Sequence, residues 1–242
     1  MFVEKEFYIG FRDLINFNKL SNTSLLSFLE DIAGYHSNSV GNGLNDIFKT
    51  KRSWVLLNWK VSLYKRPIYS ETLKLKTWSR KMDKIYAYRD YEIFNNSGER
   101  IGIATSKWIL LDIESKKIMK LEESLADLYK QEDKDVFGID TDFGRLKEPD
   151  DYTLEKDYKI TNNLIDVNNH VHNLYYLDIA NEVIPEDILK EKDLNNFEVL
   201  YKKEIKKDDT VKCLYKETED SYIITIKNET KDVLHSIIKY YK

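Results

Sequence analysis

The chain has 242 residues, 42% of them hydrophobic and 33% charged, with a formal net charge of −4 at pH 7, which excludes a disordered chain and gives no basic field for nucleic acid. Eight glycines, three prolines and one cysteine exclude a collagen-like repeat, a long flexible linker and an internal disulfide. No apolar run is long enough to cross a bilayer and the first residues lack a signal core, so we expect a cytoplasmic protein.

The first half of the chain predicts a strand, a long helix and then several strands. A short strand over residues 6–11 is followed by a polar loop over 16–22. Apolar or buried-type side chains then recur with the spacing of an amphipathic helix, for which Asn22 or Thr23 is the expected cap. These side chains are Leu25, Phe28, Leu29, Ile32 and His36. Alternation over 55–63 predicts a half-buried strand, a further strand follows at 73–75, and 86–94 with 100–111 predict a long hairpin.

The second half of the chain repeats this order. It predicts a strand at 158–160, a polar loop at 162–169, a helix, and strands at 197–205, 211–215, 222–227 and 233–241. The apolar face of that helix consists of Tyr176, Leu177, Ala180, Val183 and Ile184. Short similar segments also recur in the same order, namely 29–33 with 176–180, 71–74 with 209–212, and 107–108 with 239–240. A drifting offset is what loop-length differences produce in a duplicated unit.

We therefore expect an α+β protein with two tandem units, each a long helix wrapped by an antiparallel sheet. A helix with one apolar stripe has to bury it, and a sheet that wraps around the helix does so. The expected boundaries are 1–130 for the first unit, 131–157 for an acidic surface connector, and 158–242 for the second unit.

The loop before the second helix carries an acid, an amide and an imidazole in close sequence. If this segment is extended, Asp166, Asn168 and His170 lie on one side, next to helix N-terminal amides suited to a developing oxyanion. In the alternative interpretation, Asn168 and Asn169 cap the helix, Asp166 makes an Asx turn and His170 is an ordinary polar residue. At the offset that relates residues 29–33 to 176–180, the first half carries Lys19, Ser21 and Thr23 in place of Asp166, Asn168 and His170. A site built in only one half would explain this difference.

Several other chemistries are excluded or weakly supported by the sequence. There is no Gly-x-Ser-x-Gly elbow and no glycine-rich phosphate loop. The calcium-loop pattern fails at Val171 and Leu177, and His170 with His172 is not part of a paired metal-binding motif. We therefore expect no metal and no cofactor. Cys213 alternates within a strand pattern and is expected to be an inert buried thiol.

At this motif the sequence resembles the acyl-acyl carrier protein (acyl-ACP) thioesterases, plant and bacterial enzymes built from two fused hotdog units. The family pattern Asp-x-Asn-x-His-Val-x-Asn-x-x-Tyr is met by residues 166–176. The similarity extends over nearly the whole chain and includes residues 54–78 and 104–112. The resemblance implies an N-terminal hotdog with the acyl-chain pocket and a C-terminal hotdog with the catalytic residues.

The resemblance also implies a functional glutamate on the first long strand of the second hotdog. Residues 201–204, Tyr-Lys-Lys-Glu, match that segment and place Glu204 beside the motif loop. The next residue is Ile205, where some plant members have a cysteine once proposed as nucleophile, so a cysteine mechanism is not available there. The expected catalytic set is Asp166, Asn168, His170 and Glu204.

The activity that the resemblance implies is hydrolysis of fatty acyl-ACP to a free fatty acid, with water as nucleophile. Asp166 and Glu204 are the candidate bases. The expected acyl-pocket residues of the first hotdog are Phe28, Ile32, Leu57 and Trp59. An acyl-CoA thioesterase and a non-catalytic acyl-binding protein are the alternatives. Chain-length preference is not predicted.

The expected partner is acyl carrier protein, which is acidic, so a basic rim would favour docking. Two groups of cations are candidates: Lys202, Lys203, Lys206 and Lys207, and then Arg80, Lys81 and Lys84. Lysines at strand edges also serve as solvated faces, and the sequence favours neither interpretation. Because two fused hotdogs supply the pairing that single ones obtain by dimerising, both a monomer and a homodimer fit. The chain shows no plant-type transit segment, which suggests a bacterial-type cytoplasmic form.

Overall fold

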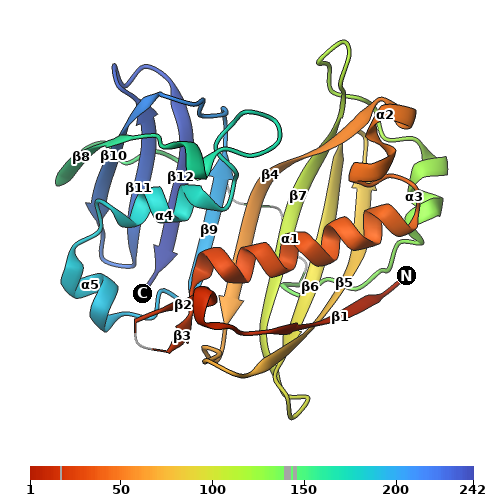
Figure 1. The fold of residues 1–242 in the computed structure, drawn as a ribbon, viewed down its shortest axis with the longest axis horizontal. Coiled ribbons are helices and arrows are strands. Elements are labelled where there is room, and N and C mark those ends of the chain that lie inside the picture. Colours follow the sequence, from red (N-terminus) through yellow and green to blue (C-terminus); the bar gives the residue numbers. More distant parts are fainter. Residues whose placement is uncertain (17, 139–142, 144–145) are drawn as a thin grey trace. The chain divides into compact units, whose positions relative to one another are not determined.

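The computed structural model describes residues 1–16, 18–138, 143 and 146–242, and the chain forms two compact units, Met1–Asp142 and Phe143–Lys242. Each unit has an antiparallel sheet with a helix against one face, which confirms the α+β class (Figure 1).

The sheet of unit 1 has the strand order β1-β5-β6-β7-β4. Its strands are β1 (Val3–Tyr8), β4 (Arg52–Leu63), β5 (Thr72–Asp83), β6 (Tyr86–Phe94) and β7 (Arg100–Asp112). Two short strands, β2 (Leu14–Ile15) and β3 (Lys19–Leu20), pair separately, and the helices are α1 (Asn22–Ser39), α2 (Ile47–Thr50) and α3 (Glu123–Tyr129). The predicted hairpin is present as β6 and β7.

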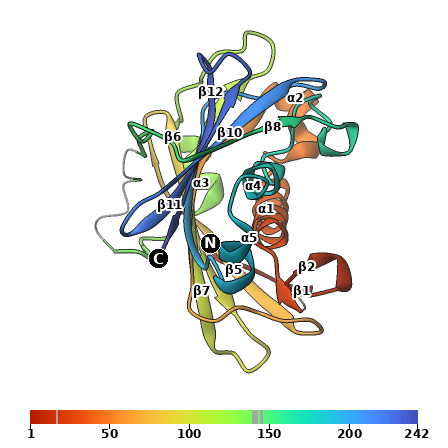
Figure 2. The same ribbon diagram turned by 90° about the vertical axis from the view of Figure 1, so that its left-hand side faces the viewer.

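Helix α1 lies along one face of this sheet (Figure 2). It begins one residue earlier than predicted, because Ser21 is the cap and its hydroxyl accepts a hydrogen bond from the Ser24 amide at 3.0 Å. The predicted helical stripe is confirmed at Leu25, Leu29, Ile32 and His36, all fully buried. This stripe supplies the core between helix and sheet.

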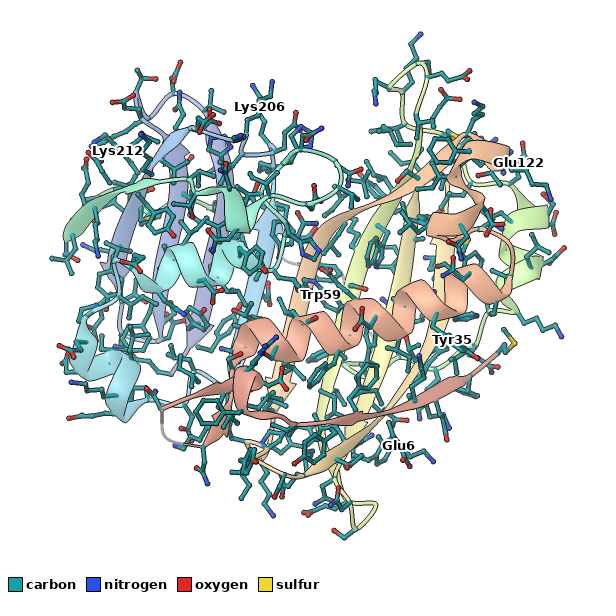
Figure 3. The ribbon with its side chains drawn as sticks, in the orientation of Figure 1. Glu6, Tyr35, Trp59, Glu122, Lys206 and Lys212 are labelled. Carbon is teal, nitrogen blue, oxygen red and sulfur yellow. The ribbon has the colours of Figure 1, made fainter. Side chains whose placement is uncertain are left out.

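Strand β4 departs from simple alternation at Leu57. The pairing of β4 with β7 shifts register between Leu56 and Asn58, so Leu57 is the extra residue of a bulge. Leu56 is buried in its place, and Leu57 is only partly buried. Beyond the bulge the alternation resumes, and Trp59, labelled in Figure 3, is fully buried.

Unit 2 repeats the topology of unit 1, with strand order β8-β10-β11-β12-β9. Its strands are β8 (Leu154–Lys159), β9 (Asn196–Tyr201), β10 (Thr210–Glu217), β11 (Ser221–Asn228) and β12 (Leu234–Tyr241), and its helices are α4 (Tyr175–Asn181) and α5 (Glu186–Glu191). Read in chain order, β8, β9, β10, β11 and β12 take the places of β1, β4, β5, β6 and β7. The predicted duplication is therefore confirmed.

The helix of unit 2 is shorter than expected. The α4 helix ends at Asn181, and α5 begins after Pro185, its N-cap. All five predicted apolar side chains are nevertheless buried, because Val183 and Ile184 fold into the core from the turn after α4. Proline cannot donate a backbone hydrogen bond, which is why the helix does not run on into α5.

The segment after α3 packs against the sheet of unit 1. The Trp78 indole donates to the Lys134 carbonyl at 2.8 Å, and the Val136 amide donates to the Asp90 carboxylate at 3.1 Å. Residues 131–138, which the sequence places in the connector, are thus held by β5 and β6. At the other end of the predicted connector, β8 begins at Leu154.

The buried His36 should make the stability of the protein fall as the solution is acidified. Burial, assisted by the Arg89 charge beside it, lowers the pKa of His36 to about 3. The neutral imidazole is favoured in the folded state, so its contribution is fully present above pH about 6.5 and is lost as pH falls toward 3, by up to about 1.4 kcal/mol per pH unit. In denaturant unfolding at pH 7, 6 and 5, the free energy of unfolding should therefore fall more steeply with falling pH for the wild type than for His36→Gln. Equal slopes would contradict this assignment.

In the part of the chain that is described, no helix is long and apolar enough to pass through a membrane.

Candidate active site

The motif loop is a tight turn, so of the two interpretations that the sequence left open the extended one is wrong. Ile165 and Val171 form a bridge, and the Asp166 amide donates to the His170 carbonyl at 2.9 Å. The turn is completed by Asn169, whose φ of +61° lies in the left-handed region that asparagine tolerates. Side chains two residues apart in this turn do not line up as they would on a strand. Asp166 and Asn168 meet through the turn itself.

The Asp166 carboxylate organises this turn. Its Oδ1 accepts the Asn168 amide at 2.8 Å and the His170 amide at 3.4 Å, and its Oδ2 accepts the Asn168 side-chain amide at 3.1 Å. The Asx turn is therefore confirmed. It also fixes the Asn168 carboxamide, which is exposed and keeps a second N–H for a ligand.

Glu204 lies on a second loop that is held against the motif loop. Strand β9 ends at Tyr201, so Glu204 is not on that strand as expected. Val171 donates its amide to the Ile205 carbonyl at 2.8 Å, and His170 forms a bridge with Lys206. This pairing brings Glu204 Oε1 to 4.0 Å from His170 Nε2, with Glu204 51% exposed.

Two side chains not included in the predicted site brace the Glu204 loop. The Tyr176 hydroxyl accepts the Ile205 amide at 3.1 Å and donates to the Lys203 carbonyl at 3.4 Å. His235 Nδ1 lies 3.1 Å from the same Lys203 carbonyl. Burial raises the pKa of Tyr176, so its hydroxyl stays protonated. The tyrosine at the end of the motif was a visible signal, whereas nothing in the sequence connects His235 with Glu204.

The first amides of α4 are already paired within the chain. The helix begins at Tyr175, its N-cap is Leu174, and neither Asn168 nor Asn169 caps it. The amides of Tyr175, Tyr176 and Leu177 are bonded to the carbonyls of His172, Asn173 and Leu174. An oxyanion role for the amides at this helix end therefore stays a prediction.

Unit 1 lacks this constellation at the equivalent positions. The Leu20 amide donates to the Pro67 carbonyl, just as the Val171 amide donates to the Ile205 carbonyl. Lys19 forms a bridge with Ile68, just as His170 forms a bridge with Lys206. These bonds align Ile15, Lys19 and Arg66 with Asp166, His170 and Glu204. The comparison with Lys19, Ser21 and Thr23 expected from the sequence offset is therefore wrong. The conclusion that only one half carries the polar set is unchanged.

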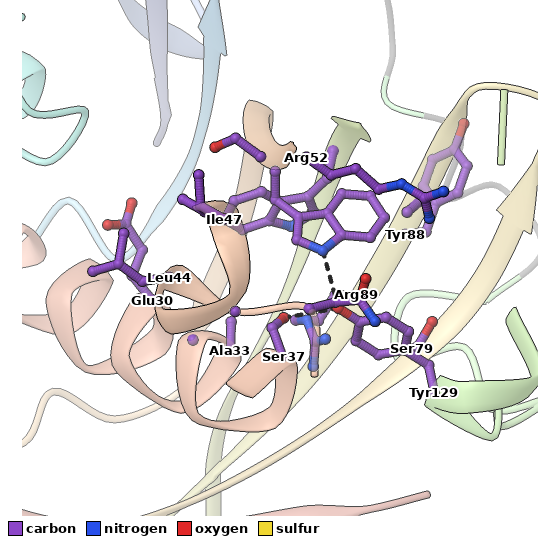
Figure 4. Close-up of a pocket in the computed structure, with 17 residues that line it drawn as sticks. Glu30, Ala33, Ser37, Leu44, Ile47, Arg52, Ser79, Tyr88, Arg89 and Tyr129 are labelled. Atoms are coloured by element: carbon purple, nitrogen blue, oxygen red, sulfur yellow. Dashed lines mark hydrogen bonds between the residues drawn. The ribbon is translucent and has the colours of Figure 1, made fainter. Parts of the chain in front are cut away.

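The four expected acyl-pocket residues lie in or near the core of unit 1. Ile32 and Trp59 are fully buried, Phe28 stacks on Phe7 with ring centroids 5.0 Å apart, and Leu57 sits at the bulge. A cavity of about 240 Å³ lies elsewhere in this unit, along the second half of α1, and none of the four residues lines it (Figure 4). Their role stays a prediction.

The surroundings of Glu204 are open and carry both signs of charge. A surface hollow of about 530 Å³ is lined by two lysines and by three acids besides Glu204, namely Lys203, Lys206, Asp208, Asp209 and Glu229. All four lysines of the first predicted cation group are exposed, and Lys206 lies at the rim of unit 2 (Figure 3). In the second predicted cation group, Arg80 is only 15% exposed and is paired with Asp90 and Asp135, so it does not contribute an exposed charge.

Cys213 takes no part in the site. It is fully buried, its thiol lies 3.4 Å from the Ile179 carbonyl, and burial raises its pKa to about 12. The predicted burial of this thiol is confirmed. The described residues contain no group of three or more His, Cys, Asp and Glu side chains that could hold a metal ion.

Two hotdog units in one chain, with a polar constellation in only the second, define the class of fused double-hotdog proteins. The model of the acyl-ACP thioesterase N-terminal domain matches residues 2–129, and that of the C-terminal domain matches residues 147–240. The chain therefore belongs to the acyl-ACP thioesterase family.

Relatives and solved structures agree with this assignment. The chain is 25% identical to the chloroplastic oleoyl-acyl carrier protein thioesterase of Coriandrum sativum over 83% of its own length and 58% of that protein. It is 24% identical to the chloroplastic oleoyl-acyl carrier protein thioesterase 1 of Arabidopsis thaliana, in an alignment that covers 90% of this chain and 63% of that protein. The chain thus spans about three fifths of the length of these two relatives.

The fold of the whole chain is similar to that of an acyl-ACP thioesterase from Bacteroides thetaiotaomicron, with a TM-score of 0.84, 19% identity and coverage of 100% and 98% of the two chains. It is also similar to the 12:0-ACP thioesterase from Umbellularia californica, with a TM-score of 0.86, 17% identity and coverage of 100% and 97%.

Proposed function

We propose that this protein hydrolyses the thioester of fatty acyl-ACP and releases the free fatty acid. The observation that carries the proposal is the pairing of the motif loop with the Glu204 loop, which brings a carboxylate, an imidazole and a fixed carboxamide to one exposed place. Family membership supplies the substrate class, since the plant relatives are oleoyl-acyl carrier protein thioesterases.

In the proposed reaction, Glu204 is the base that removes a proton from water. The water oxygen bonds to the thioester carbon, the carbon–sulfur bond breaks, and His170 passes a proton to the leaving thiolate. The Asn168 carboxamide donates to the carbonyl oxygen as negative charge develops there. Asp166 accepts three hydrogen bonds from its own loop, so its role in the proposed reaction is to position Asn168.

We further propose acyl carrier protein as the partner, docked on the exposed lysines around Glu204. Lys203 and Lys206 line the hollow, and Lys202 and Lys207 are exposed next to them in the chain, so the four together would complement an acidic protein. The proposed compartment is the cytoplasm, which suits a chain with a single, unpaired cysteine.

The test is fatty acid release from matched ACP and CoA thioesters of eight to eighteen carbons, by the wild type and Asp166→Ala. Faster turnover of the ACP series, lost in the variant, is expected. Preference for CoA would make the protein an acyl-CoA thioesterase. Tight binding without release from either series would favour a non-catalytic acyl-binding protein and overturn the proposal.

Tyr176→Phe should lower kcat by about tenfold with little change in KM, because it loosens the loop that carries Glu204. The buried Ile205 amide loses its acceptor, which should also cost about 1–3 kcal/mol of unfolding free energy. The matched control is Tyr201→Phe, which removes a tyrosine hydroxyl that donates to the Asn173 carbonyl at 3.0 Å. An equal loss of kcat in both variants would contradict this role.

A further inference from the structure

A β-bulge in β12 directs His235 toward the loop that carries Glu204. In the pairing of β11 with β12, the partners of two successive β11 residues are Ser236 and Leu234, so His235 is the extra residue of the bulge. A bulge changes the direction of a side chain, and bulges are common next to active sites. His235 is 5% exposed, and its Nδ1 lies 3.1 Å from the Lys203 carbonyl oxygen.

His235 holds Lys203, the residue before Glu204, by both of its backbone polar groups. The His235 carbonyl accepts hydrogen bonds from the amides of Lys202 and Lys203, at 2.9 and 3.4 Å. Its imidazole donates from Nδ1 to the Lys203 carbonyl, because a carbonyl oxygen can only accept. The Tyr176 hydroxyl donates to the same carbonyl at 3.4 Å, so both lone pairs of this oxygen are used. These contacts fix the direction in which the chain enters Glu204.

Unit 1 contains the same bulge with a different side chain. The pairing of β6 with β7 passes over Ile101, which is the extra residue of that bulge and is 2% exposed. The Ile101 carbonyl accepts from the amides of Tyr64 and Lys65, at 2.8 and 3.3 Å, which repeats the backbone contacts of His235. The bulge and its backbone contacts therefore belong to the duplicated fold, and an aliphatic side chain is sufficient to form them.

The imidazole occurs in the unit that also has the carboxylate. The repeated contacts align Lys65 with Lys203, so the next residues, Arg66 and Glu204, correspond as well. This is the same correspondence that the pairing of the motif loop gives. Since the bulge forms without an imidazole in unit 1, the hydrogen bond from His235 is an addition specific to the unit with Glu204.

We propose that His235 is a positioning residue for the hydrolysis: its Nδ1–H fixes the Lys203 carbonyl and thereby keeps Glu204 beside His170. This inference rests on the proposed function, in which Glu204 is the base. Glu204 is 51% exposed and its Oε1 lies 4.0 Å from His170 Nε2, so its direction depends on the backbone that carries it. A displacement of about 1 Å at a reacting group can cost about 10²-fold in rate.

The experiment is steady-state hydrolysis of acyl-ACP by the full chain, with thermal unfolding on the same preparations. His235→Ile installs the side chain that unit 1 has at this bulge, so it should fold, and its kcat should fall about 10- to 100-fold with KM unchanged. His235→Asn restores an N–H donor near the position of Nδ1 and should keep kcat within about threefold of the wild type. Wild-type kcat in His235→Ile, or equal losses in both variants, would overturn the proposal.

A double-mutant cycle separates action through Glu204 from a general loss of structure. In the Glu204→Gln background, adding His235→Ile should lower kcat by less than about twofold, because displacing the base has no cost once the base is removed. A further loss as large as that of the single variant would overturn the proposal. Tyr241→Phe is the control on the same strand, since its hydroxyl donates to the Glu198 carboxylate at 3.0 Å, and its kcat should stay within about twofold of the wild type.

The failure of this inference can be distinguished from the failure of the proposed function. A wild-type protein that releases no fatty acid from acyl-ACP would refute both. An active wild type with an equally active His235→Ile variant would refute the role of His235 alone.

Discussion

Glu204→Gln is expected to lower acyl-ACP turnover by about 10²- to 10⁴-fold, the contribution typical of a general base. Glutamine has nearly the same shape as glutamate but cannot take a proton from water. Glu204 is half exposed, and the ion-pair partner found for it in the described chain is His170 at 4.0 Å. The free energy of unfolding should consequently change by less than about 1 kcal/mol.

The measurement is single-turnover hydrolysis of acyl-ACP, with thermal unfolding on the same preparations. Glu219→Gln is the matched control, since Glu219 is exposed in the turn between β10 and β11, away from both loops of the site. Turnover by Glu204→Gln within a factor of three of the wild type would exclude Glu204 as the base. In that case Asp166 would be the remaining carboxylate, despite its three hydrogen bonds.

The contrast between Asp166 and Glu204 shows why the two carboxylates should differ on mutation. Asp166 is tied into its loop by the amides of Asn168 and His170, so replacing it also releases the Asn168 carboxamide. The Glu204 side chain does not hold its loop through such hydrogen bonds, so its replacement should leave both loops in place. A loss of activity accompanied by loop disorder is thus expected for Asp166→Ala, and a loss of activity alone for Glu204→Gln.

Much of the fold could be predicted because it depends on patterns local in the chain. Strand β6 spans 86–94 in both prediction and structure, since the following turn defines its end. The bulge at Leu57 could not be predicted, because it depends on how β4 registers with β7. The short α4 was missed for a similar reason: its apolar spacing continues past the helix, and only Pro185 marks the end of the regular backbone.

The site residues could be named from the sequence, but their geometry could not be derived. The sequence is compatible with an extended segment and with a turn at Asp166, Asn168 and His170. The bridge between Ile165 and Val171 shows that the segment is a turn. Glu204 lies beyond the last residue of β9, so strand periodicity says nothing about where it points. Its approach to His170 depends on pairing between segments more than thirty residues apart.

The burial of polar residues inside unit 1 could not be predicted from the sequence either. A strand position occupied by Arg89 or Asp90 is ordinarily assigned to solvent, yet both are buried on β6. Their burial becomes understandable only with their partners, which come from α1, β5 and β7 and from the segment after α3. Asp90 therefore gives the sharpest test of how that segment is held.

Asp90→Ala is expected to lower the free energy of unfolding by about 3 kcal/mol, because it breaks a buried ion pair. Asp90 is fully buried, lies 3.3 Å from Arg80 and accepts from the Thr105 hydroxyl at 2.6 Å and the Val136 amide at 3.1 Å. Its removal leaves the Arg80 charge with less compensation and takes away the acceptor of the Val136 amide, one of the contacts that hold the segment at 131–138. Amide exchange at Val136 should therefore quicken.

Asp135→Ala is the matched control, since Asp135 also contacts Arg80 but is 24% exposed, and a loss of about 1 kcal/mol or less is expected for such a pair. Acidity should separate the two variants further. Burial raises the pKa of Asp90 to about 6, so its stabilising contribution is greatest below pH about 4 and declines as pH rises through 6. The gap between wild type and Asp90→Ala should thus be wider at pH 4 than at pH 7. A gap of constant size would contradict the raised pKa of Asp90, and similar losses in both variants would show that Asp90 does not hold this segment.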